Sequence, residues 1–229
     1  MIFERISRNF QLKFKDRVSA ASILADTAKS SIKKDAKNDI LLFGIPRGGV
    51  ITADTVATRL SIPNLDIITP RKLTDPDNKE QAIGSIMEDG TTYIDEQLIR
   101  DSGISLDYIE KEKQAQIAEI KRRTELYHSE VRHYRNAVNS TIILVDDGAA
   151  TGATAIAAAR WIRKVLHPIF LVIAVPVAPK QTVKLLEGEC DLVKVVVSPT
   201  NFHSVGQFYQ DFSVVTDEQV ISILRQRKV

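Results

Sequence analysis

Cysteine is scarce in this sequence: Cys190 is the single thiol. One thiol cannot form an internal disulfide, and Cys190 has no second thiol or histidine beside it at the spacing of a metal site. Long apolar runs are lacking as well, since none approaches the roughly 18 residues that a membrane-spanning helix needs. We therefore expect a soluble, cytoplasmic protein that does not enter a membrane.

An excess of charge of one sign is also missing. The chain has 31 basic and 29 acidic residues, which gives a formal net charge of +2. Such a balance provides no general attraction to nucleic acid, so we expect no nucleic-acid partner. With 229 residues, 44% of them hydrophobic and 26% charged, the chain fits one globular domain over residues 1–229.

Helical and strand patterns alternate along the chain. Asp16 is a good N-cap for a helix predicted from Arg17 to about Lys33. Short apolar runs indicate strands over residues 40–45, 65–69, 85–94, 141–145, 169–177 and 192–197. Helical periodicity predicts further helices over about residues 50–60, 105–137, 153–166 and 181–187. This alternation is typical of an α/β fold with a mainly parallel central sheet and helices on both faces.

The segment 143–154, ILVDDGAATGAT, combines acidic, small and hydroxyl residues. Asp146 and Asp147 follow a predicted buried strand, at the edge where open α/β sheets bind ligands. Their carboxylates can hold ribose hydroxyls directly or through a Mg²⁺ ion. The residues after them open a helix and leave backbone amides free to close on a phosphate group. These loop residues are Gly148, Ala149, Ala150, Thr151, Gly152, Ala153 and Thr154.

Other nucleotide-binding motifs are excluded by their spacing. No GK[ST] follows the glycines of this loop, so it is not a Walker phosphate loop, and the chain has no GxGxxG dinucleotide fingerprint. The sequence also has no GxSxG nucleophile elbow, which argues against a hydrolase triad. The plain alternative to a binding loop is a strand-to-helix turn with two solvated aspartates.

The loop resembles the motif with which type I phosphoribosyltransferases bind 5-phosphoribosyl 1-pyrophosphate (PRPP), and the resemblance extends over most of the chain. The segment 44–50, GIPRGGV, resembles the family's pyrophosphate loop, which takes up a non-proline cis peptide. The resemblance implies that Arg47 and the amides of Gly48 and Gly49 grip the pyrophosphate. The residues agree, because an arginine beside two unhindered amides suits a phosphate. A glycine turn that caps a helix is the alternative.

Residues 71–84 resemble the family's flexible hairpin arm, which closes over the substrates. By this resemblance Arg71, Lys72 and Lys79 neutralise the leaving pyrophosphate. Glu80 lies in the same arm, and adenine enzymes of the family use a glutamate there as a proton-transfer group. A solvated, charged hairpin is the alternative for each of these residues.

Residues 198–212 resemble the small C-terminal hood that holds the acceptor base. Phe202, Phe208 or Tyr209 would stack on a planar ring there, or else form the core of the hood. Gly148 replaces the aliphatic residue that the family usually carries. Ala150 matches adenine enzymes, whereas hypoxanthine-guanine enzymes have an aspartate at this position.

The resemblance implies a Mg²⁺-dependent glycosyltransferase of nucleotide salvage. It would move the 5-phosphoribosyl group from PRPP to a small heterocyclic base, purine-like by analogy, and release pyrophosphate. Asp146 and Asp147 would hold the metal and, with Glu80, are the catalytic candidates.

Two other functions and one structural question stay open. A non-catalytic protein of the same fold that senses PRPP or a nucleotide is the first alternative. A phosphatase or hydrolase acting on a phosphorylated sugar is the second, although the chain has no nucleophile or metal-ligand cluster for it. The long helical insertion at 105–137 has three open roles, which are a homodimer contact, a cover for the site and a solvated face.

Overall fold

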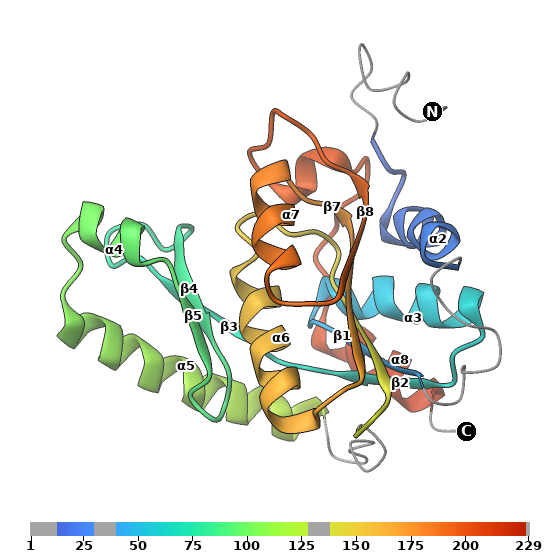
Figure 1. Ribbon diagram of the computed structural model, residues 1–229, viewed down its shortest axis with the longest axis horizontal. Helices are drawn as coiled ribbons and strands as arrows, with labels where there is room; N and C mark the ends of the chain where they lie inside the picture. Colours follow the sequence, from blue (N-terminus) through green and yellow to red (C-terminus); the bar gives the residue numbers. More distant parts are fainter. Residues whose placement is uncertain (1–12, 30–39, 128–137, 228–229) are drawn as a thin grey trace.

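The computed structural model describes residues 13–29, 40–127 and 138–227. Within these residues a five-stranded parallel sheet has the strand order β2-β1-β6-β7-β8. The strands are β1 (Ile40–Gly44), β2 (Asn64–Ile67), β6 (Thr141–Val145), β7 (Phe170–Val177) and β8 (Leu192–Val197). Helices cover both faces of this sheet, as the sequence predicts (Figure 1).

Alternation along the strands divides the core into two layers. Ile142 and Leu144 of β6 pack under α6 (Ala153–Leu166) and α7 (Lys180–Glu187). Ile143 and Val145 point to the other face, which α2 (Arg17–Ala28) and α3 (Gly48–Leu60) cover. All four strand residues are almost fully buried. The sheet is therefore apolar on both faces, which explains why its strands read as continuous hydrophobic runs.

A second, antiparallel sheet stands apart from the first. Its strands are β3 (Arg71–Thr74), β4 (Ala82–Ile86) and β5 (Thr92–Ile94), in the order β3-β4-β5. It lies between α6 and a long helix, α5 (Leu106–Tyr127), with the short α4 (Glu96–Ser102) at its outer end (Figure 1). Leu73 and Ile83 of this sheet are buried against Ile109 and Ile120 of α5.

The hairpin arm differs from the sequence prediction in the bounds of its strands. The strand expected over residues 85–94 is two strands, β4 and β5, because a turn with Gly90 at φ 85° separates them. The hairpin itself is formed by β3 and β4 and does not include β2, which belongs to the central sheet.

Among the described residues, two α-helices have no counterpart in the prediction. They are α4 and α8 (Asp217–Gln226), which begin at the capping residues Asp95 and Thr216. The predicted ends of two other helices, residues 30–33 and 128–137, lie outside the described residues.

The segment after β8 folds back over the sheet edge as a small hood that contains a 3₁₀ turn, η4 (Val205–Phe208). Phe14 holds the hood to the start of α2: its amide donates to Phe208 O at 2.7 Å, and its carbonyl accepts from Gln210 N at 2.8 Å. The N-terminal and C-terminal parts of the chain are thus joined directly beside the ends of β7 and β8.

Across the described ranges, the search for a helix both long and apolar enough to span a bilayer finds none.

Candidate functional site

The order of the central strands reverses between β1 and β6. From β1 the chain continues through α3 to β2 on one side, and from β6 it continues through α6 to β7 and β8 on the other. Open parallel sheets bind ligands at the carboxyl ends of the strands at such a switch point. Gly44 pairs with Val145, and Ile45 N donates to Val145 O at 3.0 Å. The two predicted binding loops therefore leave the sheet side by side.

Gly48 and Gly49 lie directly against the aspartates. A Cβ atom at Gly49 would lie 2.7 Å from Asp146 Oδ1, and one at Gly48 would overlap Asp147 Oδ2. Residues without a side chain are needed for this approach. The structure thus brings the predicted pyrophosphate loop and the predicted PRPP loop into contact. The peptide bond between Pro46 and Arg47 is cis, as the resemblance implies.

The aspartate pair concentrates negative charge in a partly buried place. Burial raises the pKa of Asp146 well above its usual value, and the charge of Asp147 raises it further. Burial also raises the pKa of Asp147, although the nearby Arg17 guanidinium opposes this rise. Asp147 N donates to Asp146 Oδ1 at 2.8 Å. Paired carboxyl groups with raised pKa values are typical of sites that bind cations or handle protons.

Arg17 is a site residue that the sequence analysis missed. Its Nε donates to Asp147 Oδ2 at 2.7 Å, and its Nη1 donates to Ser213 O at 2.8 Å. The guanidinium carbon lies 3.9 Å from the centroid of the Phe212 ring. The sequence carries one signal for this role: a basic residue begins α2, where the helix dipole favours acidic ones.

The loop after Asp147 ends at the N-terminus of α6. Gly152 is the N-cap of α6, with φ 79° and no side chain to cap the first turn, although Thr151 Oγ1 accepts from Ala153 N at 3.3 Å. Thr182 donates its hydroxyl to Ala150 O and so fastens the middle of the loop to α7. Thr151 is exposed at the tip. A helix N-terminus presents amide donors and the positive end of the dipole, which suits a phosphate group.

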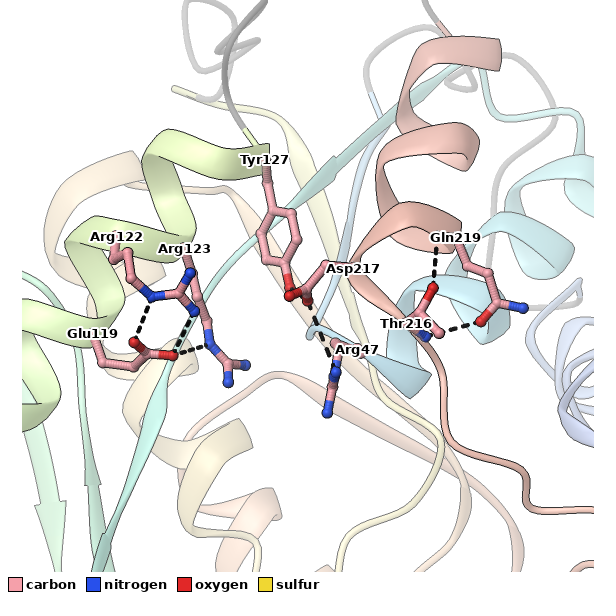
Figure 2. Close-up of polar contacts among 8 residues, drawn as sticks. All are labelled: Arg47, Glu119, Arg122, Arg123, Tyr127, Thr216, Asp217 and Gln219. Atoms are coloured by element: carbon pink, nitrogen blue, oxygen red, sulfur yellow. Dashed lines mark hydrogen bonds and ion pairs between the residues drawn. The ribbon is translucent and has the colours of Figure 1, made fainter.

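Three predicted cations gather on the other side of the aspartates. Arg47 lies at the start of α3, with its Nη1 atom 4.0 Å from Asp217 Oδ1 (Figure 2). Arg71 Nε donates to Gln116 Oε1 at 3.0 Å. The charge of Lys72 acts on Asp146, where it opposes the rise of the pKa. Burial lowers the pKa of Arg71, and Arg47 is among the like charges that lower it further.

Lys79 and Glu80 lie elsewhere in this structure. Lys79 Nζ donates to Tyr108 Oη at 2.8 Å, near the start of α5. Arg71 interacts with Arg123, which lies on α5 fifteen residues after Tyr108. A helix rises 1.5 Å per residue, so roughly 22 Å separates these two contacts. The roles predicted for Lys79 and Glu80 stay predictions, and both need the arm to move.

Two of the three candidate aromatic residues form the core of the hood. Phe208 and Tyr209 are buried, and Tyr209 Oη donates to Asp147 O at 2.6 Å. Phe202 stays partly exposed and packs on Phe208 with 5.3 Å between ring centroids. Val205 fills the space beside Gly148 that an aliphatic side chain would need. Phe202 is therefore the candidate that keeps ring surface for a base, and stacking by any of the three stays a prediction.

The same arrangement of loops lies within a region that matches known proteins. The family profile described as the phosphoribosyl transferase domain matches residues 14–212. Candidate phosphoribosyl transferases from two strains of Mycobacterium tuberculosis, Rv0571c and MT0597, are 34% identical over 188 residues. These alignments cover 81% of this chain and 41% of each relative, so the chain spans about two fifths of their length.

A solved structure agrees with the fold. The crystal structure of the protein TT1426 from Thermus thermophilus has 34% sequence identity and a TM-score of 0.74. The similarity covers 93% of this chain and 98% of that one. Because the family profile spans most of the sequence, the chain belongs to the phosphoribosyl transferase domain family.

Proposed function

We propose that this protein transfers the 5-phosphoribosyl group from PRPP to a small nitrogenous base, purine-like in shape, and releases pyrophosphate with the help of Mg²⁺. The observation that carries the proposal is the contact of Gly48 and Gly49 with Asp147 and Asp146 at the switch point of the sheet. The aspartate pair lies between the N-terminus of α6 and a group of arginines. These three parts match the ribose, the 5-phosphate and the diphosphate of PRPP.

Each part of the substrate has its own protein groups in this proposal. The amides at residues 150–154 would bind the 5-phosphate at the start of α6. Arg47 and the amides of Gly48 and Gly49 would bind the diphosphate. Asp146 and Asp147 would accept hydrogen bonds from the ribose hydroxyls. The substrate would lie across the carboxyl edge of the sheet, from α6 to α3.

The acid pair fits a divalent metal ion. Burial and mutual repulsion raise the pKa of Asp146, so a cation beside it would relieve an unfavourable charge. Mg²⁺ prefers oxygen ligands and commonly uses one or two carboxylates together with phosphate oxygens. We therefore assign Asp146 and Asp147 as the protein ligands. When bound, Mg²⁺ would neutralise charge on the diphosphate leaving group.

The reaction would exchange one bond for another at the first ribose carbon. The bond from this carbon to the diphosphate oxygen breaks, and its electron pair leaves with the diphosphate. A nitrogen of the base supplies the pair for the new bond and then loses its proton. Positive charge on the ribose ring would be stabilised by the nearby carboxylates, and Arg47 would stabilise the departing anion. Glu80 would accept the proton after the arm closes.

A sensor of PRPP or a nucleotide is the second candidate, and one contact favours it. Arg17 already pairs with Asp147, and the catalytic candidate Glu80 lies on the distant end of the arm. A protein that only binds its ligand needs neither a free second carboxylate nor closure of the arm.

Pyrophosphate release from PRPP and Mg²⁺, measured over a panel of purine and pyrimidine bases, tests the proposal. We expect release with one base, and we expect Asp147→Asn to abolish it. Asp107→Asn is the matched control, because Asp107 is an exposed acid at the start of α5. PRPP binding without release on any base would favour the sensor. Release that survives in Asp147→Asn would contradict the site.

A further inference from the structure

One face of α5 carries a row of polar residues that leads to the candidate site. Glu112, Gln116, Glu119 and Arg123 follow one another at spacings of four, three and four residues, so they share a side of the helix. Glu112 Oε1 accepts from Thr74 Oγ1 at 3.0 Å. Gln116 Oε1 accepts from Arg71 Nε at 3.0 Å. The first half of the row therefore lies along β3.

The direction of this contact places Arg123 at the edge of the central sheet. Helix α5 and strand β3 run in opposite directions here, because Glu112 contacts Thr74 and the later residue Gln116 contacts the earlier residue Arg71. The row thus continues past the start of β3, toward the end of β2. One turn after Arg123, Tyr127 packs with Ile67, the last residue of β2, and with Val50 of α3. Arg123 lies between these two contacts.

Arg123 and Arg47 both act on the charge of Arg71. Figure 2 shows the ends of Arg47 and Arg123 pointing to the same side, into the space between α5 and the start of α8. Burial lowers the pKa of Arg71, and Arg123 is the next largest cause of this shift, with Arg47 contributing as well. Like charges that are held close in a partly buried place repel each other, and an anion among them would relieve the repulsion.

Two acidic neighbours, Glu119 and Glu112, raise the pKa of Arg71 and so oppose this shift. Glu119 accepts from Arg123 Nε at 2.7 Å and from Arg122 Nε at 2.8 Å, so one carboxylate serves two arginines. These two hydrogen bonds lower the pKa of Glu119 to about 2, and Glu119 therefore stays ionised and holds Arg123 in place at neutral pH. Arg47 is held more loosely, because its 4.0 Å pair with Asp217 is longer than a hydrogen bond.

We propose that Arg123 is a further diphosphate-binding residue, which forms a site of three guanidinium groups with Arg47 and Arg71. The inference rests on the proposed function, because it takes the diphosphate end of PRPP as the ligand. Planar guanidinium groups bind phosphate oxygens in pairs, and several of them can surround a diphosphate. The long helical insertion would then have a defined role, which is to complete the site from the side of the hairpin arm.

The chain offers a matched control for this proposal in the neighbouring arginine. Arg122 and Arg123 both donate to Glu119, but the Arg122 side chain is 58% exposed and the Arg123 side chain 17%. Arg122→Gln and Arg123→Gln therefore each remove one charge and a donor to the same carboxylate, to which Arg122 donates twice and Arg123 once. Only Arg123→Gln removes a group from the proposed site. Arg123→Met keeps the buried stem and separates loss of charge from loss of packing.

Binding of inorganic pyrophosphate with Mg²⁺, measured by titration calorimetry on the full chain, is the test. We expect Arg123→Gln and Arg123→Met to weaken binding by about tenfold or more, and Arg122→Gln to change it by less than about twofold. Ribose 5-phosphate should bind all variants equally, because its phosphate belongs at the start of α6. A melting curve for each variant checks the fold.

Each other outcome overturns the assignment of Arg123. Unchanged pyrophosphate binding in Arg123→Met, or an equal loss in Arg122→Gln, would do so and leave the proposed function standing. Wild-type protein that does not bind pyrophosphate would also overturn it. PRPP binding by the same wild-type sample then shows whether the proposed function fails as well.

Discussion

Asp146 is a residue whose surroundings are unfavourable for the fold and favourable for binding. Its carboxyl group lies next to a second carboxyl group, and burial and this neighbour raise its pKa. The folded protein therefore binds a proton more readily at Asp146 than the unfolded chain does. Functional sites commonly carry such destabilising charge, because the ligand compensates for it.

The pH dependence of stability follows from this shift. The raised pKa means that the free energy of unfolding falls as pH rises from the ordinary value of 3.8 through the higher folded value. Asp146→Asn removes the group whose pKa is raised, so without Mg²⁺ it should raise the melting temperature at neutral pH and leave it nearly unchanged below about pH 4. Thermal melts of both proteins over this pH range measure the effect. A variant less stable than wild type at neutral pH would contradict the shift.

Gly48 gives a second test at the scale of one residue. Gly48→Ala would place a Cβ atom on the Asp147 carboxylate and 2.8 Å from Arg17 Nε. We expect it to weaken PRPP binding by more than about tenfold and to cost roughly 1–3 kcal/mol of stability, as overpacking does. Calorimetry and denaturant unfolding measure the two effects.

Gly188→Ala is the control for Gly48→Ala. Gly188 has φ −74°, and its added Cβ atom would lie 3.4 Å from its nearest neighbour, so this variant should behave like wild type. If Gly48→Ala bound PRPP normally, the contact between the two loops would not matter for the ligand.

Among the elements, the hairpin arm is the one whose function depends on movement. Tyr108 Oη accepts from Lys79 and donates to Thr74 O at 2.8 Å, so α5 holds the arm at its outer end. Tyr108→Phe removes both bonds, of which the one to Thr74 O contributes roughly 0.5–1.5 kcal/mol. Amide hydrogens of residues 75–81 should then exchange about two- to tenfold faster.

Hydrogen exchange read by mass spectrometry measures this release of the arm. Tyr93→Phe is the matched control, because Tyr93 packs on the α6 side of the same small sheet, against the core of the central sheet. Equal exchange in Tyr108→Phe and wild type would show that α5 does not restrain the arm.

The elements that the sequence predicted best are short apolar runs bounded by turn residues. Strands β6 and β8 agree with the predicted runs, because an apolar run bounded by turn residues has one simple solution. The split between β4 and β5 was missed although Asp89 and Gly90 form a recognised hairpin signal. The start of α8 was missed although Thr216 and Gln219 form a capping box.

At the scale of the whole molecule, the site is assembled from residues far apart in the sequence. Local motifs identified the two loops, because each loop carries its own chemistry. Arg17 and Arg123 could not be found in this way, since only the fold brings them to Asp147 and Arg71. The sequence left open which hood aromatics form the core, because the burial of Tyr209 depends on the contact between the hood and Phe14.

Mg²⁺-dependent binding of PRPP is the measurement that tests the central claim most directly. Calorimetry would compare wild type with Asp146→Asn combined with Asp147→Asn, and with a control pair of exposed acids, Asp26→Asn with Asp107→Asn. We predict that wild type and the control bind PRPP only with Mg²⁺, and that the site variant keeps its fold but loses binding. Equal binding by the site variant would contradict the assignment of the aspartate pair.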